Sequence, residues 1–189
     1  MTIAVILFFG CTNQRIDHVV ISGKLFNSEG TKKIYMDRLD LNTLVVIDST
    51  EVNEKGEFVL TPKIHEIGFY RLHLQQNNFF TLIVDTVDSI YIEANASDIG
   101  YTFSVNGSES SDLMRQLHQF VIKTNKQLDS LKKVYSAYQN TPELPSIMPS
   151  LDAAFTSTVK KQKEFIKDFI SNHSTDFSCV AAVNYLDPQ

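Results

Sequence analysis

The chain has 189 residues, of which 43% are apolar and 21% are charged, a balance typical of a folded globular protein and unlike that of a disordered one. Its formal net charge is −5, and basic residues cluster only around residues 160–167, which argues against nucleic acid as a partner. Cys11 and Cys179 are its two cysteines, too few for a disulfide-stapled fold.

Sequence motifs for several kinds of chemistry are missing. The chain has no Cys-x-x-Cys pair, no Gly-x-Ser-x-Gly and no glycine-rich phosphate loop. Its five histidines show no spacing typical of metal ligands, and its acidic residues form no recognisable catalytic pair. We therefore expect no catalytic residue, no cofactor and no metal, and hence a protein that is not an enzyme.

The first eleven residues predict an export signal. Residues 3–9 are all apolar, too few to cross a membrane, which needs about 20 residues, but enough for the apolar region of a signal peptide. The run leads into Phe8-Phe9-Gly10-Cys11, which resembles the lipobox of bacterial lipoproteins. The basic residues that usually precede such a run are absent, and the alternative is a buried first strand that ends in a Gly-Cys turn.

The lipobox resemblance implies a membrane anchor. In bacterial lipoproteins the lipobox cysteine is diacylated through its sulfur and becomes the mature N-terminus, and several acyl chains together hold a protein stably on a membrane. We therefore expect residues 1–11 to be a lipoprotein signal peptide, Cys11 to be the lipidation site and residues 12–16 to be a linker. The expected location is the bacterial cell envelope, with the protein lipid-anchored and facing the periplasm.

Residues 17–106 predict an antiparallel β-sandwich of about eight short strands. Each expected strand is rich in β-branched and aromatic residues, and turn residues separate it from the next. Arg71 and His73 alternate with apolar residues, so one face of their strand is expected to pack and the other to meet solvent. The expected strands are His18–Phe26, Lys33–Leu39, Thr43–Val52, Glu57–Leu60, Gly68–Gln75, Phe79–Val84, Ser89–Ala94 and Thr102–Val105.

Residues 108–187 predict a helical region, so the fold class is α+β: a sandwich followed by a helical hairpin and a short third helix. Apolar side chains recur at steps of three and four, as in a long amphipathic helix, which Ser110 or Ser111 is expected to cap. The residues expected on the buried stripe of this helix are Leu113, Leu117, Phe120, Thr124, Leu128, Leu131, Tyr135 and Tyr138.

The second half of the hairpin is expected after a proline-containing break. The segment Pro142–Pro149 interrupts the first helix, and a second helix follows until Asn172 and His173. A third, short helix is expected from about Asp176 to Leu186. The inward residues expected on the second helix are Leu151, Phe155, Val159, Ile166 and Phe169 or Ile170.

Several short segments in order resemble a known family. They are Ile21-Ser22-Gly23-Lys24-Leu25, Ile47 to Val52 leading into Lys55-Gly56-Glu57-Phe58, Gly68-Phe69-Tyr70-Arg71-Leu72, and Val105-Asn106-Gly107-Ser108. Residues 17–187 thereby resemble the N-terminal domain of unknown function numbered 4369 in envelope lipoproteins of Bacteroidetes. In that family the domain usually precedes a thioredoxin-like domain that carries the redox Cys-x-x-Cys pair. No residue of this chain matches that pair, so the resemblance assigns no redox residue here.

The remaining candidate residues each have two interpretations. His73 beside Arg71 is either an anion-binding patch or part of a solvated strand face, and Cys179 is either a thiol that pairs with a partner or a small core residue. Lys160, Lys161, Lys163 and Lys167 either meet acidic lipid headgroups or form a solvated helix face.

Two functions follow from these observations. One is a non-catalytic accessory module of a thioredoxin-family envelope lipoprotein, which acts by tethering and by contact with a thioredoxin-like domain or another envelope protein. The alternative is a stand-alone envelope lipoprotein that binds a ligand or peptide on the sandwich. Its candidate exposed aromatic side chains are Phe69, Tyr91 and Tyr101, each of which could equally belong to the core. A hydrolase with an unfamiliar site is a third hypothesis and requires a deep pocket with converging polar groups.

Overall fold

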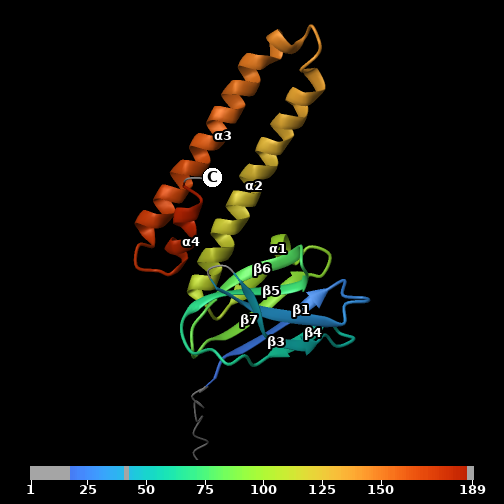
Figure 1. Ribbon diagram of the computed structural model, residues 1–189, viewed down its shortest axis with the longest axis vertical. Helices are drawn as coiled ribbons and strands as arrows, with labels where there is room; N and C mark the ends of the chain where they lie inside the picture. The colour runs from blue at the N-terminus through green and yellow to red at the C-terminus, as the bar shows by residue number, and fades with distance from the viewer. Residues whose placement is uncertain (1–17, 41–42, 187–189) are drawn as a thin grey trace, which may run out of the picture.

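The computed structural model describes residues 18–40 and 43–186. Two packed sheets form a β-sandwich, and two long helices form an arm that stands away from it (Figure 1). The predicted α+β fold, with strands first and helices after them, is confirmed. The strands are β1 (Val20–Phe26), β2 (Lys33–Leu39), β3 (Leu44–Glu51), β4 (Glu57–Leu60), β5 (Gly68–Gln75), β6 (Asn78–Val84), β7 (Ser89–Asn95) and β8 (Ser104–Asn106). The helices are α1 (Ile99–Thr102), α2 (Glu109–Tyr138), α3 (Leu144–Asn172) and α4 (Ser178–Asn184).

The strands divide into two four-stranded sheets. One sheet has the order β4-β1-β7-β8 and the other the order β3-β2-β5-β6. All pairs are antiparallel except β1 with β7, which are parallel. A wholly antiparallel sandwich was the expectation, because parallel neighbours ordinarily need a helical crossover. Here the chain between β1 and β7 builds the second sheet and β4, so no crossover helix is required.

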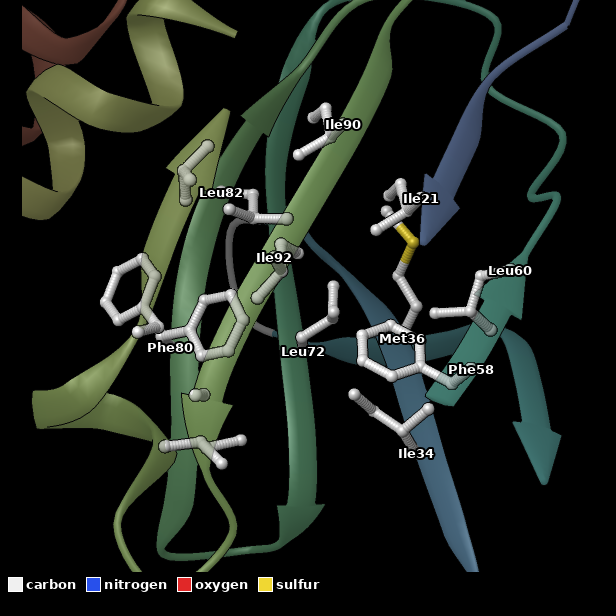
Figure 2. Close-up of a cluster of buried hydrophobic side chains, with 14 of the residues drawn as sticks. Ile21, Ile34, Met36, Phe58, Leu60, Leu72, Phe80, Leu82, Ile90 and Ile92 are labelled. Atoms are coloured by element: carbon white, nitrogen blue, oxygen red, sulfur yellow. The ribbon is translucent and has the colours of Figure 1, made fainter. Parts of the chain in front are cut away.

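The core lies between the two sheets. Leu72 and Leu82 of one sheet and Ile21 and Ile92 of the other are fully buried and face one another across it (Figure 2). Because side chains alternate along a strand, each sheet presents its apolar set to the other and its remaining residues outward. Phe80 stacks on Phe103 with ring centroids 4.1 Å apart at one end of this core.

Gly23 of β1 shows how little space remains between β1 and its neighbours β4 and β7 in the same sheet. A Cβ atom at this position would clash with the main-chain oxygen of Ile92 and would lie 2.7 Å from Cζ of Phe58. Any side chain here would therefore push β1 away from β7 or displace the Phe58 ring.

Near the last strand the structure differs from the expectation. The chain forms the short helix α1 up to Thr102, and β8 begins only at Ser104. Asp98 caps α1, since its carboxylate accepts a hydrogen bond from the Tyr101 amide at 3.2 Å. α1 has only four residues, too few for apolar side chains to recur at helical spacing. The sequence of this segment therefore predicted a loop followed by a strand.

The start of α2 also differs. Ser108 is the cap, and its hydroxyl accepts a hydrogen bond from the Ser111 amide at 3.3 Å. Neither Ser110 nor Ser111 caps the helix as expected. Ser110 donates to the Asp176 carboxylate at 2.6 Å, and the fully buried Ser111 bonds to β6 instead.

The arm is the predicted antiparallel hairpin, but α3 begins earlier than expected. The chain turns between residues 139 and 143, and α3 starts at Leu144 with Pro145 in its first turn and Pro149 within the helix. Proline suits a first turn because the first amides of a helix have no partner inside it. Pro149 lies beyond that turn, so the helix lacks one main-chain hydrogen bond there.

Burial along the arm stops short of its tip. Leu113 and Leu117 near the sandwich are buried, whereas Tyr135 is 44% exposed and Phe155 is 47% exposed. Both residues were expected to face inward, as was Tyr138, which is also exposed. The arm extends past the sheet, so its outer half has only the partner helix to pack against (Figure 1).

The register of β6 predicts unequal losses of stability for two neighbouring phenylalanines. Phe80→Ala should lower the free energy of unfolding by about 3–5 kcal/mol, because a fully buried ring leaves a cavity. Phe79→Ala is the matched control, since Phe79 faces out of the sandwich and is 37% exposed, and should cost clearly less. Urea denaturation followed by circular dichroism measures both, and equal losses would contradict the register.

Candidate functional site

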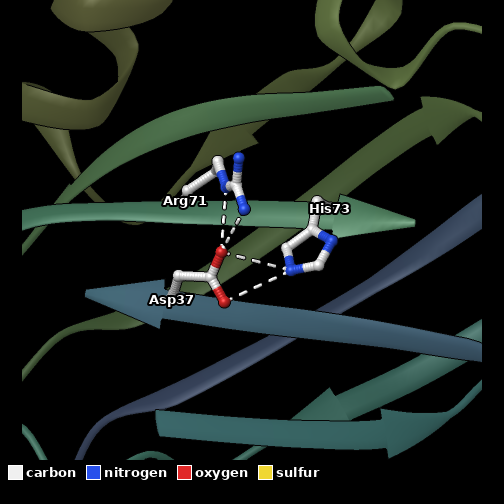
Figure 3. Close-up of polar contacts among 3 residues, drawn as sticks. All are labelled: Asp37, Arg71 and His73. Atoms are coloured by element: carbon white, nitrogen blue, oxygen red, sulfur yellow. Dashed lines mark hydrogen bonds and ion pairs between the residues drawn. The ribbon is translucent and has the colours of Figure 1, made fainter. Parts of the chain in front are cut away.

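A cluster of polar side chains lies on the outer face of the β3-β2-β5-β6 sheet. It consists of Asp37 from β2 and of Arg71 and His73 from β5 (Figure 3). Arg71 donates from Nε to Oδ2 of Asp37 at 2.9 Å and from a terminal nitrogen to the same oxygen at 2.5 Å. Nε2 of His73 lies 3.2 Å from Oδ1 of Asp37.

The strand register brings these residues together. Asp37 lies directly opposite Arg71, and Tyr35 lies opposite His73 in the antiparallel β2–β5 pair. The Tyr35 ring stacks on the His73 ring with centroids 5.2 Å apart, and the Arg71 guanidinium lies 5.2 Å from the centre of the Phe79 ring. Aromatic side chains thus flank the ion pair on both sides.

Although the cluster faces outward, Asp37 is buried and Arg71 and His73 are half-buried. Exposed fractions of the side chains are 2% for Asp37, 14% for Arg71 and 13% for His73. The interpretation of Arg71 and His73 as a solvated strand face is therefore wrong. The sequence did not predict that Asp37 belongs to this cluster, because an acidic residue in an alternating strand resembles any other solvent-facing residue.

The geometry favours a structural role for this cluster. A buried carboxylate needs charged or hydrogen-bonding partners, and Arg71 and His73 supply them. Because two donors of Arg71 are used by Asp37, fewer remain for an external anion. Nδ1 of His73 is buried without a hydrogen-bond partner, which favours the tautomer that carries its proton on Nε2 and donates it to Asp37.

Other predicted residues fall in separate places. Cys11 lies outside the described residues. Cys179 is half-buried in α4, and its thiol donates to the main-chain oxygen of His173 at 2.8 Å. Burial, and then the nearby Asp176 carboxylate, raise the pKa of this thiol, which disfavours the reactive thiolate.

The candidate aromatic side chains do not form one surface. Tyr91 and Tyr101 are exposed by 41% and 42%. Phe69, the third candidate, packs instead against Phe177 at the base of the arm, with ring centroids 5.0 Å apart. Within residues 18–40 and 43–186, no three His, Cys, Asp or Glu side chains come close enough to hold a metal ion. None of the helices in that part of the chain is both long and apolar enough to span a membrane.

The arm is the second candidate site. Its outer part exposes apolar side chains by 40–47%, although such residues normally pack between paired helices. They are Val134, Tyr135, Tyr138 and Phe155. Apolar side chains gathered on one projecting element are typical of a protein-contact surface.

The buried ion pair predicts a large effect of one substitution. Asp37→Asn should lower the free energy of unfolding by about 3 kcal/mol, because it leaves the half-buried Arg71 without its counter-charge. The matched control is Asp40→Asn just after the end of the same strand, which removes the exposed Arg38–Asp40 pair and should change stability little. Urea denaturation measures both, and similar losses would show that the Asp37 pair is not specially stabilising.

A second prediction concerns pH. Burial lowers the pKa of His118 in α2 below its ordinary value of 6.5. As pH falls below 6.5, the unfolded chain takes up a proton at this position before the folded chain does, so folding stability decreases. His118→Gln should therefore reduce the loss of stability between about pH 7 and pH 5, measured by urea denaturation. His65→Gln, in an exposed loop, is the control and should leave the loss unchanged.

Comparison with known proteins supports the family suggested by the sequence. A family model described as a domain of unknown function (DUF4369) matches residues 19–114, just over half of the chain. That match covers the whole sandwich and the first turns of α2. No curated protein matches the chain. The chain therefore belongs to the family of the domain of unknown function DUF4369.

Proposed function

We propose that this chain is a non-catalytic accessory module of a thioredoxin-family envelope lipoprotein. It is tethered to the membrane through Cys11, faces the periplasm and acts by contact with a thioredoxin-like domain or another envelope protein. The tether rests on the resemblance of Phe8-Phe9-Gly10-Cys11 to a lipobox. The link to a redox protein rests on the resemblance to lipoproteins in which this domain precedes a thioredoxin-like one.

The proposed contact function rests on the arm, which projects from the sandwich. A pair of helices of 30 and 29 residues projects from a sandwich that is already closed around its own core. At 1.5 Å per residue, α2 alone is about 45 Å long. The outer part of the arm adds no residue to the core of the sandwich and exposes Tyr135 and Phe155. A projecting apolar element of this kind serves contact with another protein better than it serves the fold.

A specific observation also favours the alternative, a stand-alone lipoprotein that binds a peptide. β3 is an edge strand, and its first residues Leu44, Val45 and Val46 are exposed by 50%, 41% and 60%. An extended peptide can add to such an edge through main-chain hydrogen bonds. Such binding would need neither the arm nor a redox partner.

Intact mass spectrometry of the protein extracted from membranes of its native host tests the proposal. Loss of residues 1–10 together with an added diacylglycerol is expected for the native protein, and both should disappear in Cys11→Ala. Cys179→Ala is the matched control and should keep the lipid. Thioredoxin-like sequence in the same product, or co-purified with it, would support the link to a redox protein.

Two outcomes would overturn parts of the proposal. An unprocessed, unlipidated chain found in the soluble fraction would refute the tether. A lipidated protein that associates with neither a thioredoxin-like domain nor another envelope protein would refute the accessory role and favour the peptide-binding alternative.

A further inference from the structure

An apolar groove runs along one face of the arm. It encloses about 560 Å³ between α2, α3 and the segment that follows α4. Its floor comprises Val121 and Leu128 of α2, Phe155 and Val159 of α3, and Leu186. A second hollow of about 410 Å³ on α3 shares Phe155, Val159 and Lys163 with it, so the two form one continuous surface.

The rim of this groove is basic. Lysines 132, 160, 163 and 167 line the two hollows, against a single acidic residue, Glu164. Two of these lysines have nearby carboxylates. Nζ of Lys132 lies 3.7 Å from Oδ1 of Asp129, and Nζ of Lys160 lies 3.7 Å from Oε1 of Glu164. In the described part of the chain, Lys163 and Lys167 make no ion pair, so their charges are available to a partner.

Shape and charge together identify the partner. We propose that the groove binds an amphipathic helix of another protein, with apolar residues toward the floor and acidic residues toward the lysine rim. From Val121 to Lys132 the groove follows α2 for about 16 Å, which matches about three turns of a bound helix. Such helices dock through apolar residues at positions i, i+3, i+4 and i+7. This inference rests on the proposed contact function and names the chemistry of the partner.

Two other occupants fit the groove less well. Apart from Phe155, the floor residues are buried or half-buried between the helices, whereas a lipid surface meets side chains that protrude. The sandwich lies between the first described residues and the tip of the arm (Figure 1), so an N-terminal anchor favours an arm directed away from the bilayer. A second copy that used the same face would place lysine against lysine across a twofold axis, which is repulsive.

Binding of a designed peptide to the full chain tests the inference. The probe is a fluorescein-labelled helical peptide of about 18 residues with leucine on one face and glutamate on the other. Saturable binding is expected by fluorescence anisotropy at low salt, and it should weaken as salt is added. A peptide with lysine in place of glutamate should not bind, because it meets the basic rim with like charge.

Substitutions in the chain locate the site. Lys163→Glu should weaken peptide binding by about tenfold, because it reverses the charge shared by both hollows. Lys161→Glu is the matched control, an exposed lysine of the same helix that lines neither hollow, and should have little effect. Val159→Asp should also abolish binding, and its circular dichroism spectrum shows whether the arm still folds.

Three results would overturn the inference. They are no saturable binding, equal effects of the two lysine substitutions, or binding of phosphatidylglycerol vesicles without binding of the peptide. None of them bears on lipidation of Cys11, so this inference and the tether can fail independently.

Discussion

The position of the arm depends on one pair of hydrogen bonds between Ser111 and Ile83. The Ser111 hydroxyl accepts from the Ile83 amide at 3.1 Å and donates to the Ile83 carbonyl oxygen at 2.6 Å. β6 is an edge strand, so these main-chain groups have no neighbouring strand. Without Ser111 the buried Ile83 amide would lose its partner, whereas the carbonyl oxygen also accepts a hydrogen bond from the Ser108 hydroxyl at 3.3 Å. The Ile83 side chain packs with Leu113, Met114 and Leu117, which adds apolar burial at the same point.

The family match ends close to this junction. Residues 19–114 include Ile83 and Ser111 but stop at Met114, before most of α2 and all of α3. The shared part of the family is thus the sandwich together with the docking site for a helix. The outer arm, with its groove and its lysine rim, lies beyond the matched residues, and there this chain can carry contacts of its own.

Much of the sandwich could be predicted from the sequence, because alternation and turn residues are local signals. β2, β4 and β5 have the predicted bounds. What depends on neighbours in space could not be predicted in the same way. Three serines near residue 110 could each cap α2, and only the position of β6 explains why Ser111 does not. The pairing of Asp37 with Arg71 depends on strand register, and the exposure of Tyr135 depends on where the sheet ends.

The arm can present a groove only if its two helices stay together beyond the sandwich. Phe120 and Phe165 stack with ring centroids 3.7 Å apart, and Phe165 also packs against the cluster that contains the fully buried Ile166. Beyond Val121 few side chains are buried, so the outer turns gain less from packing than the inner ones. A helix pair with Phe155 exposed in the groove is less stable than one with that side chain covered. A partner helix in the groove would therefore stabilise the arm as it binds, and the sandwich holds the base of that arm at a fixed angle.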